Sequence, residues 1–343
     1  MTSVAPSVAS WSWPTEFMTP GPTIHLVVNP SAGRGRARRL LPRVHNTLAD
    51  AVPDGRVVVH IATDYADARK QCLRAVRETT PALHGRRDAL VVMGGDGMAH
   101  LGLNACAEAR TDGLDVPLGV IPAGTGNDFC RGVGIPPTVE EATRLVAEGR
   151  TRRIDLTEVT GNLAGGADRA FVGSVVSTGY DARVNKATND FRFPIGPLGP
   201  LAYGALALGE VARFTPLDYR IEIDGQPREL SSVLVAVANA GHFGGGMKIV
   251  PQADVTDGLL DVLLVGDLKR RQVLELLPKL YRGAHVGHPA VEFVRARTVR
   301  IDGEAVGRDG SRSPMFAMGD GESLGGVPLN ATVRPGLIAV FRA

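Results

Sequence analysis

The feature of this sequence that most constrains its fold is a short apolar run that leads directly into clustered glycines. Residues 89–93 lack the polar alternation of a half-exposed strand, so they predict a buried parallel strand. The run ends in Gly94-Gly95-Asp96-Gly97, and the residues after it have helical apolar spacing. A strand, a glycine turn and a helix in this order point backbone N–H groups and the positive end of the helix dipole at an anion such as phosphate. Hairpin turns also use Gly and Asp, so this motif alone leaves a structural turn open.

The same pattern occurs twice more. A predicted strand at 24–29 leads into a turn with Gly33 and Gly35, and one at 118–122 leads into a turn with Gly124 and Gly126. Alternating strands and helices with short connections predict a doubly wound parallel sheet. Ligands of such sheets bind beyond the carboxyl ends of the strands, where all three glycine turns fall. The other elements predicted in this half are a strand at 57–62 and helices at 36–49, 66–79 and 139–148.

From about residue 153 the pattern changes to consecutive strands with turn signals, which favours an antiparallel β-sandwich. We therefore expect a flexible tail rich in Ser, Pro and Thr at 1–22, an α/β domain at 23–152 and a sandwich at 153–334. The strands predicted in the sandwich half are 154–160, 170–177, 219–224, 233–238, 260–265, 291–301 and 333–341, with helices only near 200–213 and 272–283.

Composition excludes several other classes of protein. A net charge of +2 over 343 residues gives no reason to expect nucleic-acid binding. The three cysteines show no CxxC spacing, which suggests neither a disulfide framework nor a zinc site and favours a reducing compartment. No uninterrupted apolar stretch approaches the roughly 18 residues that a transmembrane helix needs.

Six motifs along the chain belong together. They are Asn29-Pro-Ser-Ala-Gly33, Gly94-Gly-Asp-Gly97, Pro122-Ala-Gly-Thr-Gly-Asn-Asp128, Ser177-Thr-Gly-Tyr-Asp181, Pro251-Gln-Ala-Asp-Val-Thr-Asp-Gly-Leu-Leu-Asp261 and Asp320-Gly-Glu322. As a set they resemble the diacylglycerol kinase catalytic-domain family, most closely its soluble bacterial lipid kinases, with sphingosine and ceramide kinases as relatives. The resemblance extends from residue 23 to the C-terminus. It implies ATP- and Mg²⁺-dependent phosphorylation of a lipid hydroxyl at the cleft between the two domains, with residues 335–343 returning as a strand to the first domain.

The resemblance also implies site residues. Asp320 and Glu322 correspond to the catalytic carboxylates, one of them the proton acceptor, and the side chains of Asp254 and Asp257 with the Leu259 carbonyl correspond to a structural magnesium loop. A type I turn with Asx capping is the alternative for that loop. Thr63 is either a helix N-cap or a hydroxyl near the nucleotide. The residues implied to line the nucleotide are Asn29, Pro30, Ser31, Ala32, Gly33, Thr63, Gly94, Gly95, Asp96, Gly97, Met98, Ala99, His100 and Thr125.

Two features complicate this interpretation. Asp302-Gly303-Glu304 repeats the catalytic tripeptide, but it follows an alternating strand and we interpret it as a hairpin turn. Beside Gly97 the family has Thr, Asn and Glu where this chain has Met98, His100 and Leu101, which removes a hydroxyl and a carboxylate from the neighbourhood of the phosphates.

The leading hypothesis is a cytoplasmic kinase that converts diacylglycerol to phosphatidic acid and contacts the inner face of the membrane peripherally. A kinase of NAD is the second hypothesis, because it shares an Asn-containing first turn and the GGDG motif. A catalytically silent nucleotide- or lipid-binding protein is the third, suggested by Met98 and Leu101. The sequence leaves a homodimer open.

Overall fold

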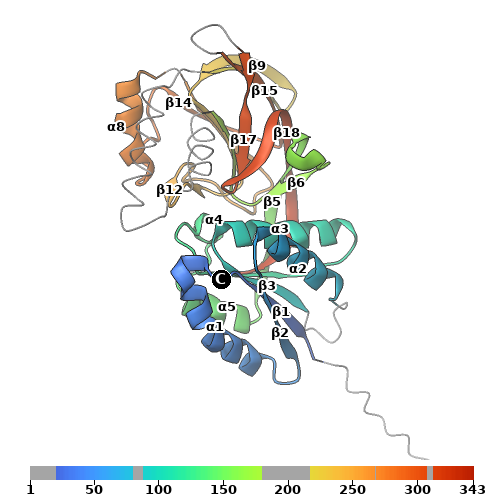
Figure 1. Ribbon diagram of the computed structural model, residues 1–343. Helices are drawn as coiled ribbons and strands as arrows, with labels where there is room; N and C mark the ends of the chain where they lie inside the picture. Colours follow the sequence, from blue (N-terminus) through green and yellow to red (C-terminus); the bar gives the residue numbers. More distant parts are fainter. Residues whose placement is uncertain (1–20, 80–87, 180–216, 267, 307–311) are drawn as a thin grey trace, which may run out of the picture.

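The computed structural model describes residues 21–79, 88–179, 217–266, 268–306 and 312–343. Two layered domains are stacked in Figure 1, with the N-terminal domain below and the sandwich above. None of the described helices combines the length and the apolarity that crossing a bilayer requires. The helix predicted near 200–213 and residues 1–20 of the predicted tail lie outside the described residues, whereas the Gly21 N–H donates to the Asp54 carbonyl at 3.0 Å.

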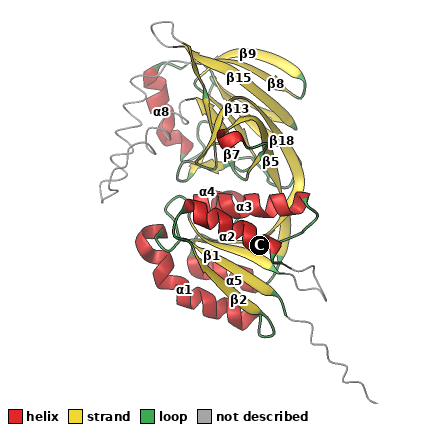
Figure 2. Ribbon diagram, turned by 45° about the vertical axis from the view of Figure 1, so that its right-hand side comes forward, coloured by secondary structure: helices red, strands yellow, loops and turns green. Residues whose placement is uncertain are grey.

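The lower domain is the predicted doubly wound sheet. Its four parallel strands are arranged in the order β4-β3-β1-β2, and helices cover both faces (Figure 2). Its elements are β1 (Thr23–Val28), α1 (Ala32–Ala51), β2 (Arg56–Ile61), α2 (Tyr65–Arg77), β3 (Ala89–Gly94), α3 (Asp96–Thr111), β4 (Leu118–Pro122), α4 (Asp128–Val133) and α5 (Val139–Ala147).

Both faces of this sheet are buried, which explains why its central strands are continuously apolar. On one face, Leu48 of α1 and Val146 of α5 belong to the same buried cluster as Val91 of β3. On the other face, α2 and α3 pack over Val92 of the same strand. Helix α3 therefore lies between the sheet and the sandwich, where side chains on its upper face reach the second domain (Figure 1).

One long strand joins the domains. Strand β18 (Glu322–Phe341) begins in the sandwich and ends in the lower domain, where Val340 pairs in parallel with Leu118 of β4. It pairs antiparallel with β5 (Thr151–Leu163) from Phe341 back to Gly325. The expected return of the last strand to the first domain is therefore confirmed, within a single strand of 20 residues.

The upper domain is the expected antiparallel sandwich. One layer has the order β14-β13-β10-β7-β17, and the other contains β9, β8, β15, β18, β5 and β6. The outer face of β10 and β13 is covered by α8 (Arg270–Leu280) through Val273 and Leu276. The remaining elements are β6 (Ala170–Val172), β7 (Val175–Gly179), β8 (Leu217–Ile223), β9 (Gln226–Ser232), β10 (Leu234–Ala238), β11 (His242–Phe243), β12 (Met247–Lys248), β13 (Leu260–Val265), β14 (Val291–Ala296), β15 (Thr298–Val306), β16 (Arg312–Pro314) and β17 (Phe316–Gly319).

Three sequence predictions about this domain were wrong. The strand predicted at 170–177 is two strands, β6 and β7, which are separated at Gly173 and Ser174 because the N–H groups of these residues donate to the Asp320 carboxylate. The strand predicted at 291–301 is two strands that break at Arg297, because the Asp224 carboxylate accepts hydrogen bonds from the Arg297 and Thr298 N–H groups at 2.9 and 2.8 Å. Asp302 and Glu304 do not form a hairpin turn. They lie inside β15, opposite Arg220 and Asp218 of β8, because the backbone pairing between these two strands continues through Glu304.

Candidate functional site

The three glycine turns lie side by side at the carboxyl edge of the lower sheet. The Gly94 carbonyl accepts hydrogen bonds from the Ala123 N–H at 2.7 Å and the Gly124 N–H at 3.1 Å, which joins the second turn to the third. A Cβ on Gly33 would lie 2.2 Å from the Ala123 oxygen, and one on Gly124 would lie 2.4 Å from the Gly95 Cα. Glycine is required at these contacts because the backbones approach too closely for any side chain.

The first turn is ordered by its own polar groups. The Asn29 Oδ1 accepts from the Ser31 N–H at 3.1 Å and from the Ser31 hydroxyl at 2.7 Å, on either side of Pro30. Gly33 and Gly35 have φ values of 57° and 81°, so the chain between Ala32 and residue 36 curls in a left-handed turn before regular helix begins. This left-handed segment leaves the first glycine turn open beside the second and third glycine turns.

The second turn begins α3, with Gly95 as its N-cap. The first N–H groups of a helix have no acceptor inside the helix and carry partial positive charge, so this end of α3 attracts anions. Met98 and Ala99 lie in the first turn of α3, and a Cβ on Gly94 would lie 2.4 Å from the Met98 Cγ. Their side chains are buried in the apolar layer under α3, as is that of Leu101, so the two main departures from the family pattern are core residues.

Asp96 connects the second turn to the third. Its Oδ1 accepts a hydrogen bond from the Phe129 N–H at 3.2 Å, at the start of α4. Burial, with a further contribution from the nearby Asp128 carboxylate, raises the pKa of Asp96 to about 6, although backbone N–H groups of α4 oppose the shift. A half-buried carboxylate at this position could bind a cation or accept a proton.

Thr63 and Thr125 are both exposed at this edge of the sheet. The Thr63 N–H and hydroxyl donate to the Asp67 Oδ2 at 2.9 and 3.2 Å. Interpretation of Thr63 as the N-cap of the following helix was wrong, because Asp64 caps α2 by accepting from the Asp67 N–H at 2.8 Å. Thr63 therefore keeps only its proposed place near the nucleotide.

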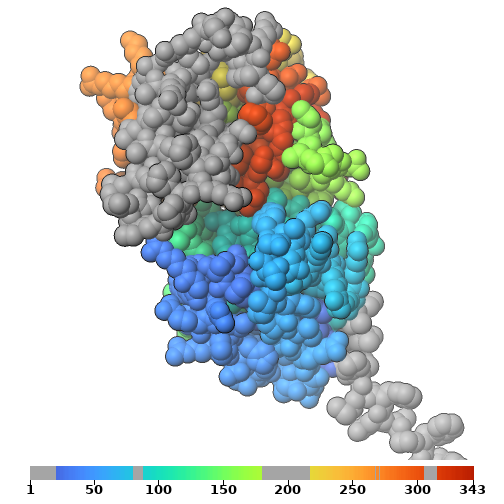
Figure 3. All heavy atoms as spheres, in the orientation of Figure 1, coloured from blue at the N-terminus to red at the C-terminus, as the bar shows by residue number. Residues whose placement is uncertain are grey.

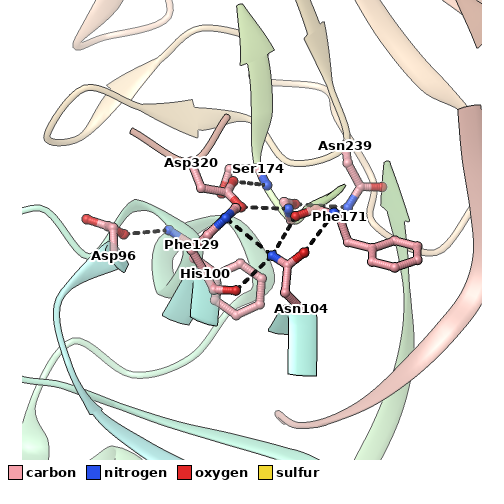
Figure 4. A network of polar contacts seen from close by, with 9 residues as sticks. Asp96, His100, Asn104, Phe129, Phe171, Ser174, Asn239 and Asp320 are labelled. Carbon is pink, nitrogen blue, oxygen red and sulfur yellow. Dashed lines mark hydrogen bonds and ion pairs between the residues drawn. The ribbon is translucent and has the colours of Figure 1, made fainter. Parts of the chain in front are cut away.

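Asp320 reaches this region from the sandwich (Figure 4). Its side chain is only 3% exposed. It accepts from the Gly173 N–H at 2.9 Å and the Ser174 N–H at 2.7 Å, and its Oδ2 lies 3.1 Å from the His100 Nδ1. Asn239 supports the arrangement from behind by donating to the Gly173 carbonyl at 3.0 Å. Asp320 is thus a carboxylate held on both oxygens.

Asn104 is a site residue that the sequence analysis did not identify. Its side chain donates to the Phe171 carbonyl at 2.9 Å and accepts from the Phe171 N–H at 2.8 Å, so it fastens α3 to β6 of the sandwich. It also donates to the His100 carbonyl at 2.9 Å (Figure 4). The signal that could have identified Asn104 in the sequence is its position one helical turn after His100, within an apolar stretch of α3 that continues to Ala107.

Glu322 has a different environment from Asp320. Its Oε1 lies 2.9 Å from the position that a Cβ of Gly97 would occupy, and a ring carbon of Tyr65 lies 3.5 Å from that position. Burial raises the pKa of Glu322, the nearby His100 lowers it, and the Asp320 carboxylate raises it further. Among the described residues no group donates a hydrogen bond to the Glu322 carboxylate. Its oxygens therefore remain available on the side that faces the glycine turn.

Asp128 makes a second contact between the domains, which the sequence analysis also did not assign to the site. It is buried at the start of α4 and accepts from the Gly245 N–H of the β11–β12 turn at 2.6 Å. Arg131 forms an ion pair with it at 3.3 Å. This contact holds the third glycine turn against the sandwich.

The loop 254–259 lies apart from the glycine turns. Asp254 and Asp257 are exposed, and each accepts from a backbone N–H two residues on, as in an Asx turn. Arg295 forms an ion pair with one Asp257 oxygen, and Asp155 anchors the loop by accepting from the Gly258 N–H at 2.7 Å. Two carboxylates and the Leu259 carbonyl are oxygen donors of the kind that a hard cation such as Mg²⁺ binds. Both Asp257 oxygens are engaged, however, one by the Leu259 N–H and one by Arg295, and the described residues contain no group of three or more His, Cys, Asp or Glu side chains that could hold a metal ion.

Comparison with known proteins places the chain in a family. Residues 23–159 match the diacylglycerol kinase catalytic domain, and residues 174–342 match the YegS C-terminal NAD kinase beta sandwich-like domain. A diacylglycerol kinase of Mycobacterium tuberculosis is 36% identical over 279 residues, which are 80% of this chain and 84% of that protein. A diacylglycerol kinase of Staphylococcus carnosus is 28% identical over 310 residues, which are 89% of this chain and 90% of that protein.

The fold has solved counterparts. A putative diacylglycerol kinase from Bacillus anthracis superposes with a TM-score of 0.72 over 95% of this chain and 99% of that one, at 22% identity. A parallel-sheet domain that matches the diacylglycerol kinase catalytic domain, joined to the β-sandwich, supports a two-domain kinase. The chain belongs to the diacylglycerol kinase family.

Proposed function

We propose that this protein transfers the γ-phosphoryl group of ATP to the hydroxyl of diacylglycerol and so forms phosphatidic acid. The observation that carries the proposal is the position of Glu322, a carboxylate from the sandwich that lies against Gly97 in the glycine turn of the other domain. A phosphate held by that turn would have a proton acceptor beside it, which is the arrangement that phosphoryl transfer to a hydroxyl needs.

In this proposal the glycine turns hold the phosphates of ATP. Helix N-termini and open glycine backbones bind phosphate through N–H groups, and Asn29, Ser31, Thr63, Thr125 and Asp96 border the same edge. Mg²⁺ bound with the nucleotide would neutralise phosphate charge, and Asp254, Asp257 and the Leu259 carbonyl would hold a second, structural ion.

Glu322 is the proposed proton acceptor and Asp320 a positioning residue. Asp320 accepts hydrogen bonds from two backbone N–H groups and faces His100, so both of its oxygens are already engaged and its position is fixed. Glu322 is without a described donor, and the raised pKa brings it nearer to neutral pH, where a general base is most effective. The lipid hydroxyl oxygen forms a bond to the γ-phosphorus, its proton passes to Glu322, and ADP departs with the electrons of the broken P–O bond.

The locations of the two proposed substrates, diacylglycerol and ATP, indicate where the protein acts. Diacylglycerol resides in membranes and ATP is cytoplasmic, so the proposed reaction takes place at the inner face of the membrane through peripheral contact.

The test is a transfer assay with radiolabelled ATP, the purified full chain and a panel of diacylglycerol, ceramide, sphingosine and NAD. Label in phosphatidic acid, lost in the Glu322→Gln variant, is the expected result. Label in NADP would identify a kinase of NAD instead. Nucleotide binding without transfer to any member of the panel would identify a catalytically silent binding protein.

A further inference from the structure

Helix α8 presents an exposed surface that the proposed catalytic site does not use. Val273 and Leu276 face the sandwich, with exposed fractions of 6% and 7%, and fasten the helix to β10 and β13. Beside that buried face Leu274 is 40% exposed, and Tyr281, just after the helix, is 51% exposed. In Figure 3 atoms of this part of the chain, in orange, protrude at the upper left of the molecule. Large apolar side chains that remain in water next to each other indicate an interaction surface.

The same surface is strongly cationic. Lys269, Arg271, Lys279 and Arg282 are exposed, and the one acidic residue among them, Glu275, is already paired with Arg271 at 2.8 Å. From residue 268 to 288 the sequence has five Lys and Arg against one Glu, a net charge of +4 in a chain whose total is +2. The rest of the protein therefore has a net charge of −2, although residues 34–43 are a second basic segment, with five Arg and no acidic residue. The α8 segment differs from it in the large apolar side chains that are exposed beside its charges.

The surface is connected to the site by direct contacts. A Cβ on Gly283, just beyond α8, would lie 2.9 Å from the Pro251 ring, and the His285 Nε2 lies 2.8 Å from the Ile249 carbonyl. Both contacts fix the end of α8 to the segment that follows β12. The adjoining β11–β12 turn is the one whose Gly245 bonds to Asp128 beside the glycine turns. In Figure 1, α8, β12 and α4 follow one another down the same side of the molecule.

We propose that this α8 surface, made of Leu274, Tyr281, Lys269, Arg271, Lys279 and Arg282, docks on an anionic lipid bilayer. Interfacial helices combine a few exposed apolar side chains with Lys and Arg, whose long stems lie along the headgroup region while their charges contact anionic headgroups. The charge complementarity favours a membrane over an uncharged protein partner. Val286, which is 51% exposed, extends the apolar part beyond the helix. The purpose of docking rests on the proposed function, because a lipid kinase must take its substrate from a bilayer.

The test is cosedimentation of the full-length protein with vesicles of phosphatidylcholine, with and without phosphatidylglycerol. The wild type should bind the anionic vesicles in preference. The Lys279→Gln/Arg282→Gln variant should bind them about 30-fold more weakly, since each basic residue near an anionic surface contributes about a fivefold factor. The Leu274→Ser/Tyr281→Ser variant should also lose on the order of tenfold.

A matched control is Lys70→Gln/Arg77→Gln, which removes the same charge from exposed positions of α2 in the other domain. It should bind as the wild type does. Equal loss in the control and the α8 variant would overturn the proposal by showing that only total charge matters. Unchanged binding of both α8 variants would also overturn it, as would α8 variants that break a dimer while still binding vesicles.

Activity separates this inference from the proposed function. With a short-chain diacylglycerol dissolved in water, no bilayer is needed, so the α8 variants should phosphorylate it at the wild-type rate and lose activity only on anionic vesicles. If the wild type phosphorylates neither form, the proposed function fails, and the vesicle-binding result still decides whether α8 docks on membranes.

Discussion

The carboxylate of Glu322 lies against the backbone of Gly97, with its Oε1 2.9 Å from where a Cβ of that glycine would be. The two residues come from different domains, and Gly97 leaves room for the carboxylate at the start of α3 because it has no side chain.

Gly97→Ala should impair catalysis without destabilising the fold. The new methyl group meets the end of a flexible side chain, so Glu322 moves aside at little cost in stability, but its displaced carboxylate loses contact with the reacting hydroxyl. A displacement of this kind lowers kcat by roughly 10- to 100-fold. Steady-state kinetics and a melting curve measure both effects. Gly266→Ala, where the nearest atom to the new Cβ is 3.7 Å away, is the control; a Gly97→Ala enzyme with wild-type kcat would contradict the placement of Glu322.

Glu322→Gln and Asp320→Asn should both lower activity, but they should affect stability differently. Glu322→Gln removes the proposed proton acceptor, so kcat falls by at least about 100-fold. The melting temperature at pH 7 should not fall, because burial raises the pKa of Glu322 and loss of its charge therefore favours the folded state. Asp320→Asn places an amide where two backbone N–H groups already donate, so it also destabilises the protein by about 1–3 kcal/mol.

The controls for this pair are Asp302→Asn and Glu304→Gln, which alter the same tripeptide within β15 and should stay within a few-fold of the wild type. In the wild type the acid limb of the kcat/KM profile should lie above the usual range for a glutamate, because burial raises the pKa of Glu322. Full activity of Glu322→Gln would assign proton transfer to another group.

Asp96→Asn should stabilise the protein while weakening nucleotide binding. Because the folded-state pKa of Asp96 is raised to about 6, folding is favoured by protonation of this group at low pH, and that contribution is lost as the pH rises from about 4 to 6. At pH 7 the charged carboxylate therefore lowers the free energy of unfolding by up to about 3 kcal/mol. The Asn variant should gain roughly 1–3 kcal/mol at pH 7 and almost nothing at pH 4.

Urea unfolding at both pH values and calorimetric titration with ATP measure these effects. Asp168→Asn, at an exposed position, should change neither quantity. A stability gain that is the same at pH 4 and pH 7 would show that the charge of Asp96 is not responsible.

Asp254→Ala/Asp257→Ala should remove any dependence of the melting temperature on Mg²⁺. These two side chains supply the carboxylates of the proposed ion, and hard oxygen ligands are what Mg²⁺ requires. Arg295→Gln is the informative partner variant. It frees the Asp257 oxygen that Arg295 holds, so its melting temperature should respond more strongly to Mg²⁺ than that of the wild type. If a chelator changes the melting temperature of neither the wild type nor Arg295→Gln, a structural ion in this loop is ruled out.

Met98→Thr/Leu101→Glu, which introduces the family's residues, should destabilise the protein rather than activate it. Both native side chains are 5% exposed and belong to the core under α3, and a carboxylate in such a position lacks both water and a partner. The expected loss is about 3 kcal/mol or more, mainly from Leu101→Glu. Chemical denaturation measures it, with Met98→Thr alone as the comparison; a stable double variant with higher activity would instead support a silent wild type.

Local patterns determined much of this architecture. Continuous apolar runs such as 89–93 identify strands buried on both faces, because no position along them can face water. Glycines at 33, 94 and 124 identify turns of close backbone approach, since any other residue would collide there. These requirements act within a few residues of the chain, so the sequence alone predicts the sheet, its helices and the edge at which the turns gather.

Contacts between distant segments were decided only by the tertiary structure. The tripeptide Asp-Gly-Glu occurs at 302 and at 320 with the same local chemistry, yet one copy pairs with β8 inside a strand and the other faces α3. His100 and Asp320 are 220 residues apart, and they meet because β18 crosses between the domains and α3 lies beneath it. Such pairings depend on how whole layers pack and on which backbone donors remain free, and neither is encoded in the residues next to a motif.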